Sequence, residues 1–290
     1  MTLRISKLTK VYDNGVKALD ELTLEAGPGL FGLLGPNGAG KSTLMRTIAT
    51  LQQPGSGGIT FEDIDVLKDP KRLRQALGYL PQEFGVYPGV SAERLLDYLA
   101  RLKGVADRKE RKRLVEQVLD ITNLYELRKA EVHRFSGGMK QRFGIAQLLL
   151  NNPRLIIVDE PTAGLDPAER KRFLNLLREV GTQCTAILST HLVDDVRGLC
   201  NEMAIIHNGR VVKQGRPAEA LRELNGKAWS RTIAREQLQG LESNYFVLSA
   251  HYRPDGEIEA RVYASEQPGP GFEATEPLLE DVYFLALRSA

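Results

Sequence analysis

One nine-residue stretch, Gly35 to Thr43, limits the possible folds of this chain more than any other feature. It reads GPNGAGKST, with three glycines and a proline ahead of a lysine and two hydroxyl side chains. The preceding residues 29–34, GLFGLL, form a short, continuously apolar run, which is typical of a strand buried in a parallel sheet. A helical pattern follows. Strand, glycine-rich loop and helix in this order predict an α/β fold with an anion-binding loop.

The residue types in this loop suit a phosphate ligand. Its glycines let successive backbone N–H groups point at one anion, and the new helix adds unpaired N–H groups and the positive end of its dipole. Lys41 can reach the β- and γ-phosphates of a nucleotide, and the Ser42 hydroxyl can bind Mg²⁺. A chance glycine turn is the structural alternative, and the loop alone leaves kinases, GTPases and ATPases open. The residues expected to contact phosphate are Gly35, Pro36, Asn37, Gly38, Ala39, Gly40, Lys41, Ser42 and Thr43.

Size and composition favour an ordinary globular protein. The 290 residues indicate about two structural units, and hydrophobic residues make up 42% of the chain. The net charge is +2 without a basic tail, so we expect no nucleic-acid partner. Cys184 and Cys200 lack metal-binding or redox spacing, which favours free thiols in a reducing compartment. No apolar run approaches the ~18 residues of a membrane span, so a cytoplasmic chain is expected.

Periodicity separates the chain into a larger and a smaller domain. Residues 3–26 alternate as two antiparallel strands around the turn at 13–15, and residues from about 83 to 150 change to helix. Ser91 is expected to cap the first of these helices, whose apolar face is expected to hold Leu95, Leu96, Tyr98, Leu99 and Leu102. Strand patterns return at 155–158 and 184–191, followed by a hairpin around Asn208-Gly209. We therefore predict a larger α/β domain at 1–223 with a helical insertion, and a small α+β appendage at 224–290. The appendage is expected to contain a hairpin turn at Asp255-Gly256, a linker at 266–277 and a final amphipathic helix.

Four further features follow the loop in a fixed order: Gln82, FSGGM at 135–139, LIIVDE at 155–160, and His191. Together with GPNGAGKST they resemble the ATP-binding subunit of ABC transporters over residues 1–220. FSGGM departs at both ends from the commonest family signature, LSGGQ. The resemblance implies a P-loop ABC-type ATPase core with an antiparallel β subdomain and a helical insertion. It also implies ATP and Mg²⁺ as cofactors.

Position and resemblance together assign roles to the polar residues at the strand ends. Asp159 ends a buried strand and is expected to hold Mg²⁺ with Ser42. Glu160 follows it and is expected to activate the attacking water. The resemblance implies that His191 contacts the γ-phosphate and that Gln82 touches Mg²⁺ or water. The structural alternatives are a solvated acid pair, a structural histidine and an ordinary loop.

A second anion site is expected at the start of another helix. Ser136, Gly137 and Gly138 open that helix, so a hydroxyl and backbone N–H groups become available there. The resemblance implies a head-to-tail dimer, in which this segment covers ATP held by the other subunit, expected to be a second copy of the chain. Residues 163–166 resemble the loop that crosses the dimer interface in the family. Asp166 also has the pattern of a simple helix cap.

The resemblance assigns two more residues to the nucleotide. Tyr12 matches the aromatic side chain that stacks on adenine, and Val16 is expected to pack beside it. Plain packing is the structural alternative for both. Lys41 is expected to act in catalysis as well as in binding.

Three classes of ABC ATPase compete for the function. DNA-repair and chromosome ATPases place a long coiled coil between the loop and the signature, whereas Lys41 and Ser136 are only about 95 residues apart. Ribosome-acting factors carry two cassettes in one chain, and this chain has one. The favoured class is a transporter subunit that binds a separate permease at the cytoplasmic face of the membrane, through EFGVYPGV (83–90) and an apolar helix at 92–103. FSGGM and the terminal PLLEDVYFLAL resemble ABC-2-type exporters, with an importer subunit or a non-transport ATPase as alternatives.

Overall fold

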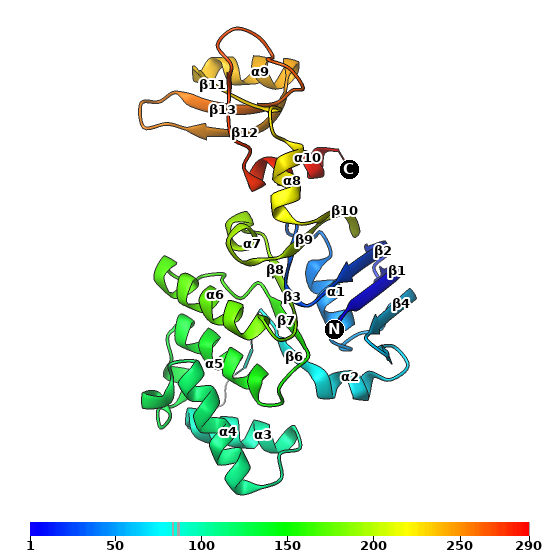
Figure 1. Ribbon diagram of the computed structural model, residues 1–290, viewed down its shortest axis with the longest axis vertical. Helices are drawn as coiled ribbons and strands as arrows, with labels where there is room; N and C mark the ends of the chain where they lie inside the picture. The colour runs from blue at the N-terminus through cyan, green and yellow to red at the C-terminus, as the bar shows by residue number, and fades with distance from the viewer. Residues whose placement is uncertain (83, 86–87, 290) are drawn as a thin grey trace. The chain divides into compact units, whose positions relative to one another are not determined.

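The computed structural model describes residues 1–82, 84, 85 and 88–289. Contacts divide the chain into two compact units, Met1–Val211 and Val212–Ala290, which are described separately (Figure 1). The sequence places the boundary after residue 223, but the structural division falls earlier. The reason is that α8 (Pro217–Glu223) packs against α10 (Leu279–Arg288) in the second unit.

The first unit is built on a mixed sheet whose strand order is β10-β9-β3-β8-β7-β6. Its inner strands are parallel, and β3 lies beside β8, which lies beside β7. Their last residues are in register, with Leu34 opposite Thr190 and Asp159 opposite Ser189. The segments after these three strands therefore meet at one edge of the sheet, where parallel sheets bind ligands. The strands are β3 (Gly29–Leu34), β6 (Leu77–Leu80), β7 (Leu155–Asp159), β8 (Thr185–Thr190), β9 (Glu202–His207) and β10 (Arg210–Gly215).

A second, antiparallel sheet of the first unit has the strand order β2-β1-β4-β5. The predicted antiparallel pair within residues 3–26 is confirmed as β1 and β2. Buried side chains from this sheet, including Leu3, Ile5 and Phe61, share one apolar core with Leu44 of α1 and Ile157 of β7. The bounds are β1 (Leu3–Val11), β2 (Lys17–Ala26), α1 (Lys41–Ile48), β4 (Ser56–Phe61), β5 (Ile64–Asp65) and α2 (Pro70–Ala76).

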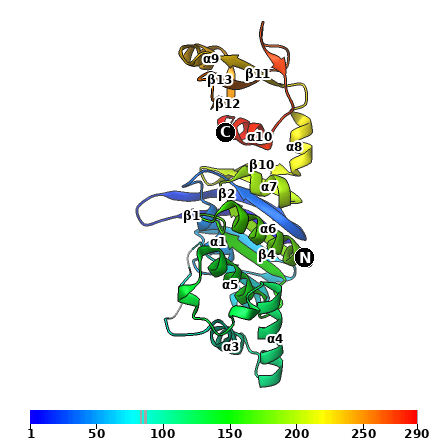
Figure 2. The same ribbon diagram turned by 90° about the vertical axis from the view of Figure 1, so that its left-hand side faces the viewer.

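The predicted helical insertion is present and has its own core. It contains α3 (Ala92–Leu102), α4 (Arg108–Ile121), α5 (Gly137–Leu149) and two 3₁₀ turns, Tyr125–Leu127 and Val132–Arg134. Figures 1 and 2 show α3 and α4 at one end of the first unit. Leu96, Leu119 and Phe143, one from each helix, are fully buried in a shared cluster.

Two expectations for α3 are wrong in detail. Ser91 precedes the helix, but its side chain makes no capping hydrogen bond. Tyr98 and Leu102 were expected on the apolar face with Leu95 and Leu96, yet they are 53% and 66% exposed. The apolar residues of α3 span a wider arc than α4 and α5 cover, so those at the margin remain in solvent.

The opposite face of the mixed sheet is covered by α5 and α6 (Pro167–Gly181), and α7 (Val193–Leu199) packs beside them. Ile145 of α5 and Phe173 of α6 lie in one apolar cluster with Ile156 and Leu188 of the sheet. The sheet is thus buried on both faces, as its apolar strands require. The sequence analysis did not anticipate α7.

The second unit is a small α+β domain with the strand order β12-β13-β11-β14. An ion pair fixes α10 to the sheet, because Arg261 of β13 donates two hydrogen bonds to Asp281 and both side chains are buried. The predicted hairpin and final helix are confirmed, but the sequence missed α8 and α9, and the expected linker at 266–277 contains β14 and the buried Phe272. The remaining bounds are β11 (Ala228–Ile233), a 3₁₀ turn (Arg235–Gln237), α9 (Leu238–Asn244), β12 (Phe246–Tyr252), β13 (Ile258–Tyr263) and β14 (Glu273–Ala274). Among the described helices of either unit, none is long and apolar enough to cross a membrane.

Candidate nucleotide-binding site

The loop between β3 and α1 needs glycine at two close backbone contacts. A Cβ on Gly35 would lie 2.5 Å from the carbonyl oxygen of Ile206, and one on Gly40 would lie 2.4 Å from that of Ala18. Gly40 also has a φ of 106°, in the left-handed region. The helix α1 begins directly after it with no side-chain cap. Its first N–H groups are therefore available to an anion.

The ammonium group of Lys41 is held at this loop. It donates hydrogen bonds to the carbonyl oxygens of Gly35 at 2.7 Å and Pro36 at 3.1 Å. It also lies 3.3 Å from Oε1 of Glu160, and the lysine side chain is only 4% exposed. A buried cation with one carboxylate neighbour is ready to exchange that partner for a phosphate oxygen.

Glu160 lies between Lys41 and His191, the histidine that was predicted to contact the γ-phosphate. Its φ of 45° turns the chain sharply after β7, and its N–H group bonds the carbonyl oxygen and the hydroxyl of Ser189, each at 3.1 Å. Its Oε2 atom is 3.3 Å from Nδ1 of His191, which is 43% exposed. The structure therefore brings Lys41, Glu160 and His191 together as the sequence predicted.

Oxygen ligands suitable for a hard cation lie beside them. The Ser42 hydroxyl donates to Oδ1 of Asp159 at 3.3 Å, and Asp159 is 2% exposed and also accepts from the Ser189 hydroxyl. A hydroxyl and a carboxylate next to a phosphate cradle are the donor set that Mg²⁺ prefers, so these residues fit the ion. Gln82 reaches the same cavity. Among the described residues, no group of three or more His, Cys, Asp or Glu side chains forms a separate metal site.

Lys41, Ser42, Gln82 and Glu160 border one cavity of about 670 Å³, the size of a typical small-molecule site. The Tyr12 hydroxyl lies 3.2 Å from both Thr43 Oγ1 and Gln52 Oε1, which fixes the aromatic ring at the cavity wall. Val16 also lines the wall and is 54% exposed. The lining residues are Tyr12, Val16, Lys17, Ala18, Asn37, Gly38, Gly40, Lys41, Ser42, Thr43, Gln82, Glu160, Asn208 and Gly209.

The sequence analysis missed part of this wall. The turn Asn208-Gly209 was expected only as a hairpin, but Gly209 donates to the carbonyl oxygen of Ala39 and its own carbonyl accepts from Asp20, each at 3.0 Å. A Cβ on Gly209 would lie 2.8 Å from the carbonyl oxygen of Ala18. The turn therefore supports the phosphate loop from behind. Its Asn-Gly pair signals a turn, but nothing in the sequence indicates which loop it contacts.

The predicted second anion site lies apart from this cavity. Ser136 caps α5 by accepting a hydrogen bond from the N–H of Met139 at 3.3 Å, and both Ser136 and Gly137 are exposed. A Cβ on Gly137 would meet only Leu165, at 3.7 Å. Residues 136 and 137 thus present a helix start to solvent instead of contacting Lys41 of the same chain.

Comparison with known proteins agrees with this arrangement. A family model described as ABC transporter matches residues 19–163. The linearmycin resistance ATP-binding protein LnrL of Bacillus subtilis (strain 168) is 35% identical over 218 residues, 75% of this chain and 68% of that protein. The chain belongs to the ATP-binding proteins of ABC transporters. It is accordingly an ABC-type ATPase.

Other relatives of this ABC ATPase include an import protein and a subunit of a transporter complex. The methionine import ATP-binding protein MetN of Corynebacterium diphtheriae is 38% identical over 218 residues, 72% of this chain and 64% of that protein. A solved structure of cbiO1 from Clostridium perfringens, described as part of the ABC transporter complex cbiONQ, is also similar. It is 27% identical, with a TM-score of 0.69 over 83% of this chain and 98% of that one.

A buried carboxylate that the sequence analysis missed organises the turn that carries His191. Asp195 of α7 is 1% exposed and accepts hydrogen bonds from Thr162 at 2.9 Å and Thr190 at 3.2 Å. It also accepts from Arg170 of α6 at 2.8 Å. The carboxylate thus joins the segment after Glu160, the end of β8 and two helices. No motif marks it in the sequence, because its partners lie on three different elements.

A second missed ion pair fixes the signature helix of the ABC ATPase. Arg142 of α5 donates to the carbonyl oxygens of Thr122 and Asn123 at the end of α4, and its Nε lies 3.5 Å from Oε2 of Glu169. Glu169 stands in the first turn of α6, and a Cβ on Gly138 would lie 2.3 Å from that same oxygen. The pair therefore ties the start of α5 to the helix that follows residues 163–166.

Proposed function

We propose that two copies of this ABC ATPase bind ATP between them, head to tail, and that hydrolysis drives export through a separate permease. The separation of the two anion sites carries the proposal. One site has a buried lysine, a carboxylate pair and a cavity, whereas the other is a helix start at which Ser136 and Gly137 are exposed. Each would supply what the other lacks if two chains met face to face.

Within this proposal the chain's own residues activate water. Phosphate oxygens entering the cradle compete with Glu160 for the Lys41 ammonium. The released carboxylate remains beside His191, in reach of a water molecule that attacks the γ-phosphate, and acts as general base. Ser42 and Asp159 would hold Mg²⁺, which neutralises charge on the β- and γ-phosphate oxygens when bound. Tyr12 would stack on adenine.

Glu160→Gln tests the assignment of the base. The amide keeps the size and hydrogen bonding of the side chain but cannot accept a proton, so ATP hydrolysis should fall by about 100-fold or more. ATP affinity should change little because Lys41, Ser42 and Asp159 remain. Glu242→Gln, on an exposed position of α9, is the matched control and should keep full turnover. Unchanged turnover in Glu160→Gln would remove Glu160 as the base.

Export is favoured by the FSGGM signature, by the terminal helix and by the likeness to LnrL, a resistance protein. Import is the second candidate, supported by the likeness to MetN. The permease contact was expected to use Phe84, Val86 and Tyr87. Phe84 is half-buried between two apolar clusters and has a structural role, whereas Val86 and Tyr87 lie outside the described residues.

The permease itself is identified by affinity purification of the tagged chain from native membranes. We expect one membrane protein with several transmembrane helices to co-purify with the tagged chain. After ATP is added, inside-out vesicles that contain the complex should take up substrate if the transporter is an exporter. They should release substrate if it is an importer. Purification without any membrane partner would contradict the transporter assignment.

A further inference from the structure

Positive charge is concentrated on one short part of the helical insertion. Residues 93–113, which cover most of α3 and the first turns of α4, carry eight cationic and four acidic side chains. Their net charge of +4 exceeds the +2 of the whole chain. The nucleotide cavity uses none of these residues.

Most of these cations are free of internal partners. Three of the eight have partners: Lys103 donates to Gln147 O and Asn151 Oδ1, Lys112 pairs with Glu116, and the buried Arg111 donates to Asp97 at 2.9 Å and to the carbonyl oxygens of Val105 and Ala106. Arg111 joins α3 to α4 and so builds a rigid support. Five exposed cations around it make no ion pair or hydrogen bond through their side chains with the part of the chain that the structure describes: Arg94, Arg101, Arg108, Lys109 and Arg113.

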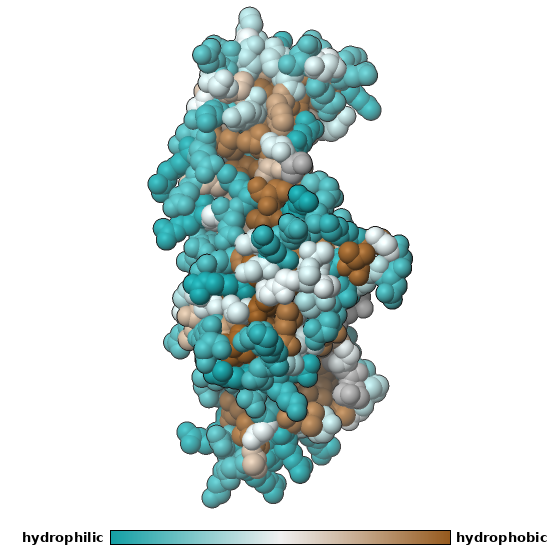
Figure 3. Space-filling view, turned by 90° about the vertical axis from the view of Figure 1, so that its right-hand side faces the viewer, coloured by the Kyte–Doolittle hydropathy of each residue, from teal (hydrophilic) through white to brown (hydrophobic). Residues whose placement is uncertain are grey.

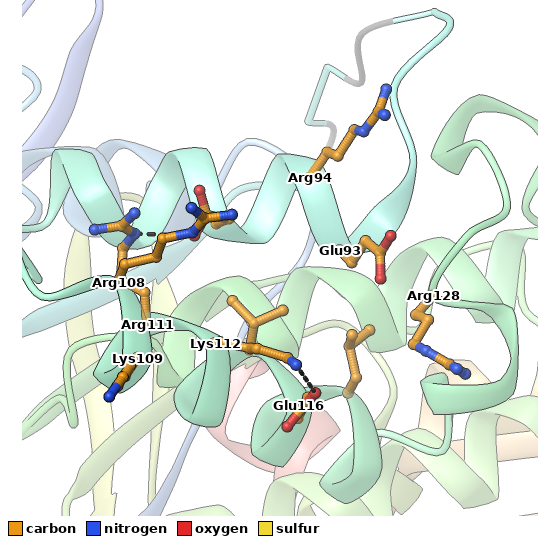
Figure 4. A pocket seen from close by; sticks show the side chains of 11 residues that line it. Glu93, Arg94, Arg108, Lys109, Arg111, Lys112, Glu116 and Arg128 are labelled. Carbon is orange, nitrogen blue, oxygen red and sulfur yellow. Dashed lines mark hydrogen bonds and ion pairs between the residues drawn. The ribbon is translucent and has the colours of Figure 1, made fainter.

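A groove of about 580 Å³ runs between α3 and α4 beside these cations. Its floor is apolar, because the buried Val115 and Leu119 line it. Figure 4 shows Arg108 and Lys109 at one end, Arg128 at the other, and Lys112 directed to Glu116. Glu93 and Asp97 of α3 also line the groove, and Glu93 stands near Arg128, so the groove combines an apolar base with mixed charge and has its free cations at the Arg108–Lys109 end.

Exposed apolar side chains complete the surface. Tyr98 and Leu102, 53% and 66% exposed, stand one turn apart on the outer side of α3, beside Arg94 and Arg101. At the lower end of Figure 3, where the helical insertion lies, apolar side chains reach the surface between hydrophilic ones. An aromatic and a leucine next to arginines are the side chains that settle at the boundary between lipid headgroups and acyl chains.

We propose that this surface, the outer face of α3 with the α3–α4 groove, binds the anionic phospholipid headgroups of a membrane. The free cations pair with headgroup phosphates, and Tyr98 and Leu102 enter the interface beside them. A free phosphate would engage the cations but would leave the two apolar side chains in water. The binding requires neither a permease nor ATP, so it stands or fails separately from the transport function.

The test is flotation of the purified full-length chain with vesicles, without a permease. Wild-type protein should float with vesicles of about one third phosphatidylglycerol in phosphatidylcholine, less so at high salt, and not with phosphatidylcholine alone. Arg94→Gln with Arg101→Gln should weaken binding to the anionic vesicles by roughly 30-fold. Lys171→Gln with Arg197→Gln removes the same charge from exposed positions of α6 and α7 and should leave binding unchanged.

Tyr98→Ser with Leu102→Ser separates lipid from other anions. Because both side chains are exposed, the double variant should fold, as checked by thermal unfolding and ATP binding, yet it should lose most of the binding that survives at high salt. Three results would overturn the proposal. The first is equal binding to anionic vesicles and to phosphatidylcholine alone, and the second is an equal loss of binding in the Arg94/Arg101 variant and in the Lys171/Arg197 control. The third is full displacement of the chain from vesicles by inorganic phosphate, together with unchanged binding in the Tyr98→Ser, Leu102→Ser variant.

Discussion

Two helix starts in the first unit look alike in sequence and differ in structure. At α1 the helix follows Gly40 without a side-chain cap, and a lysine that is 4% exposed completes a walled cavity. At α5 the Ser136 side chain caps its own helix, and Ser136 and Gly137 face solvent. Both offer N–H groups to an anion. This difference is the basis of the proposal that each chain supplies one half of a nucleotide site and a partner chain supplies the other.

The largest effect on ATP turnover is expected from a change in the nucleotide site at α1. Lys41→Ala removes the buried ammonium group from this cavity, and we expect ATP turnover to fall by about 100- to 1,000-fold. Phosphate release from radiolabelled ATP measures the rate. Lys171→Ala, at an exposed position of α6, is the control and should retain activity. Near-normal hydrolysis in Lys41→Ala would end the assignment of the cradle.

Matched glycine substitutions sharpen the comparison. Gly40→Ala places a Cβ 2.4 Å from a carbonyl oxygen at a φ of 106°, so it should destabilise the chain by about 2–4 kcal/mol and abolish ATP binding. Gly137→Ala meets only Leu165, at 3.7 Å, so it should change stability by less than about 1 kcal/mol. It should keep ATP binding but weaken ATP-dependent dimerisation. Urea unfolding and nucleotide titration compare the two; similar losses in both variants would contradict the distinction.

The nucleotide site at α1 was predictable because each of its segments is a short continuous stretch at the end of an apolar strand. GPNGAGKST, Asp159-Glu160 and His191 each stand directly after an apolar strand, and neighbouring parallel strands bring such positions together. Asp195 and the Arg142–Glu169 pair were not predictable, since each depends on helices that pack only in the folded chain. The sequence likewise gives no indication that a turn at 208–209 supports the loop.

The exposure of α3 was mispredicted for a similar reason. A 3.6-residue period identifies an apolar face, but the partner helices decide how much of that face they cover. Leu95 and Leu96 are covered, whereas Tyr98 and Leu102 are not. In the second unit, α9 is short and polar, so it lacked the periodic signal that revealed α10.

A smaller effect is expected where α5 is attached to α6. Glu169→Ala removes the carboxylate that Arg142 and Arg172 share, and the start of α5 should lose its fixed orientation. We expect ATP-dependent dimerisation to weaken by about fivefold, since one such ion pair is worth about 1 kcal/mol, with little change in the ATP affinity of the single chain. Sedimentation and nucleotide titration measure the two. Glu179→Ala on the exposed side of α6 is the control, and an equal effect there would contradict the positioning role.

The smallest effect is a pH dependence at the far end of α5. Burial lowers the pKa of Lys103 to about 8, although its ammonium donates to Gln147 O and Asn151 Oδ1. Since the ordinary lysine pKa is about 10.4, the unfolded chain binds more protons between these two values. The free energy of unfolding contributed by Lys103 should therefore rise from pH 8 to about 10.5 and be constant below. The difference between wild type and Lys103→Met in urea unfolding should follow this curve; a fall over that range would contradict it.

The central claim is that Ser136–Gly138 of one chain completes the site of another. Glu160→Gln retains ATP without hydrolysing it, so sizing chromatography with ATP and Mg²⁺ should show a shift from monomer to dimer. Adding Ser136→Arg, which places a bulky side chain at the exposed helix start, should abolish the shift while ATP binding persists. A Glu160→Gln chain that binds ATP and stays monomeric, or a dimer unaffected by Ser136→Arg, would contradict the claim.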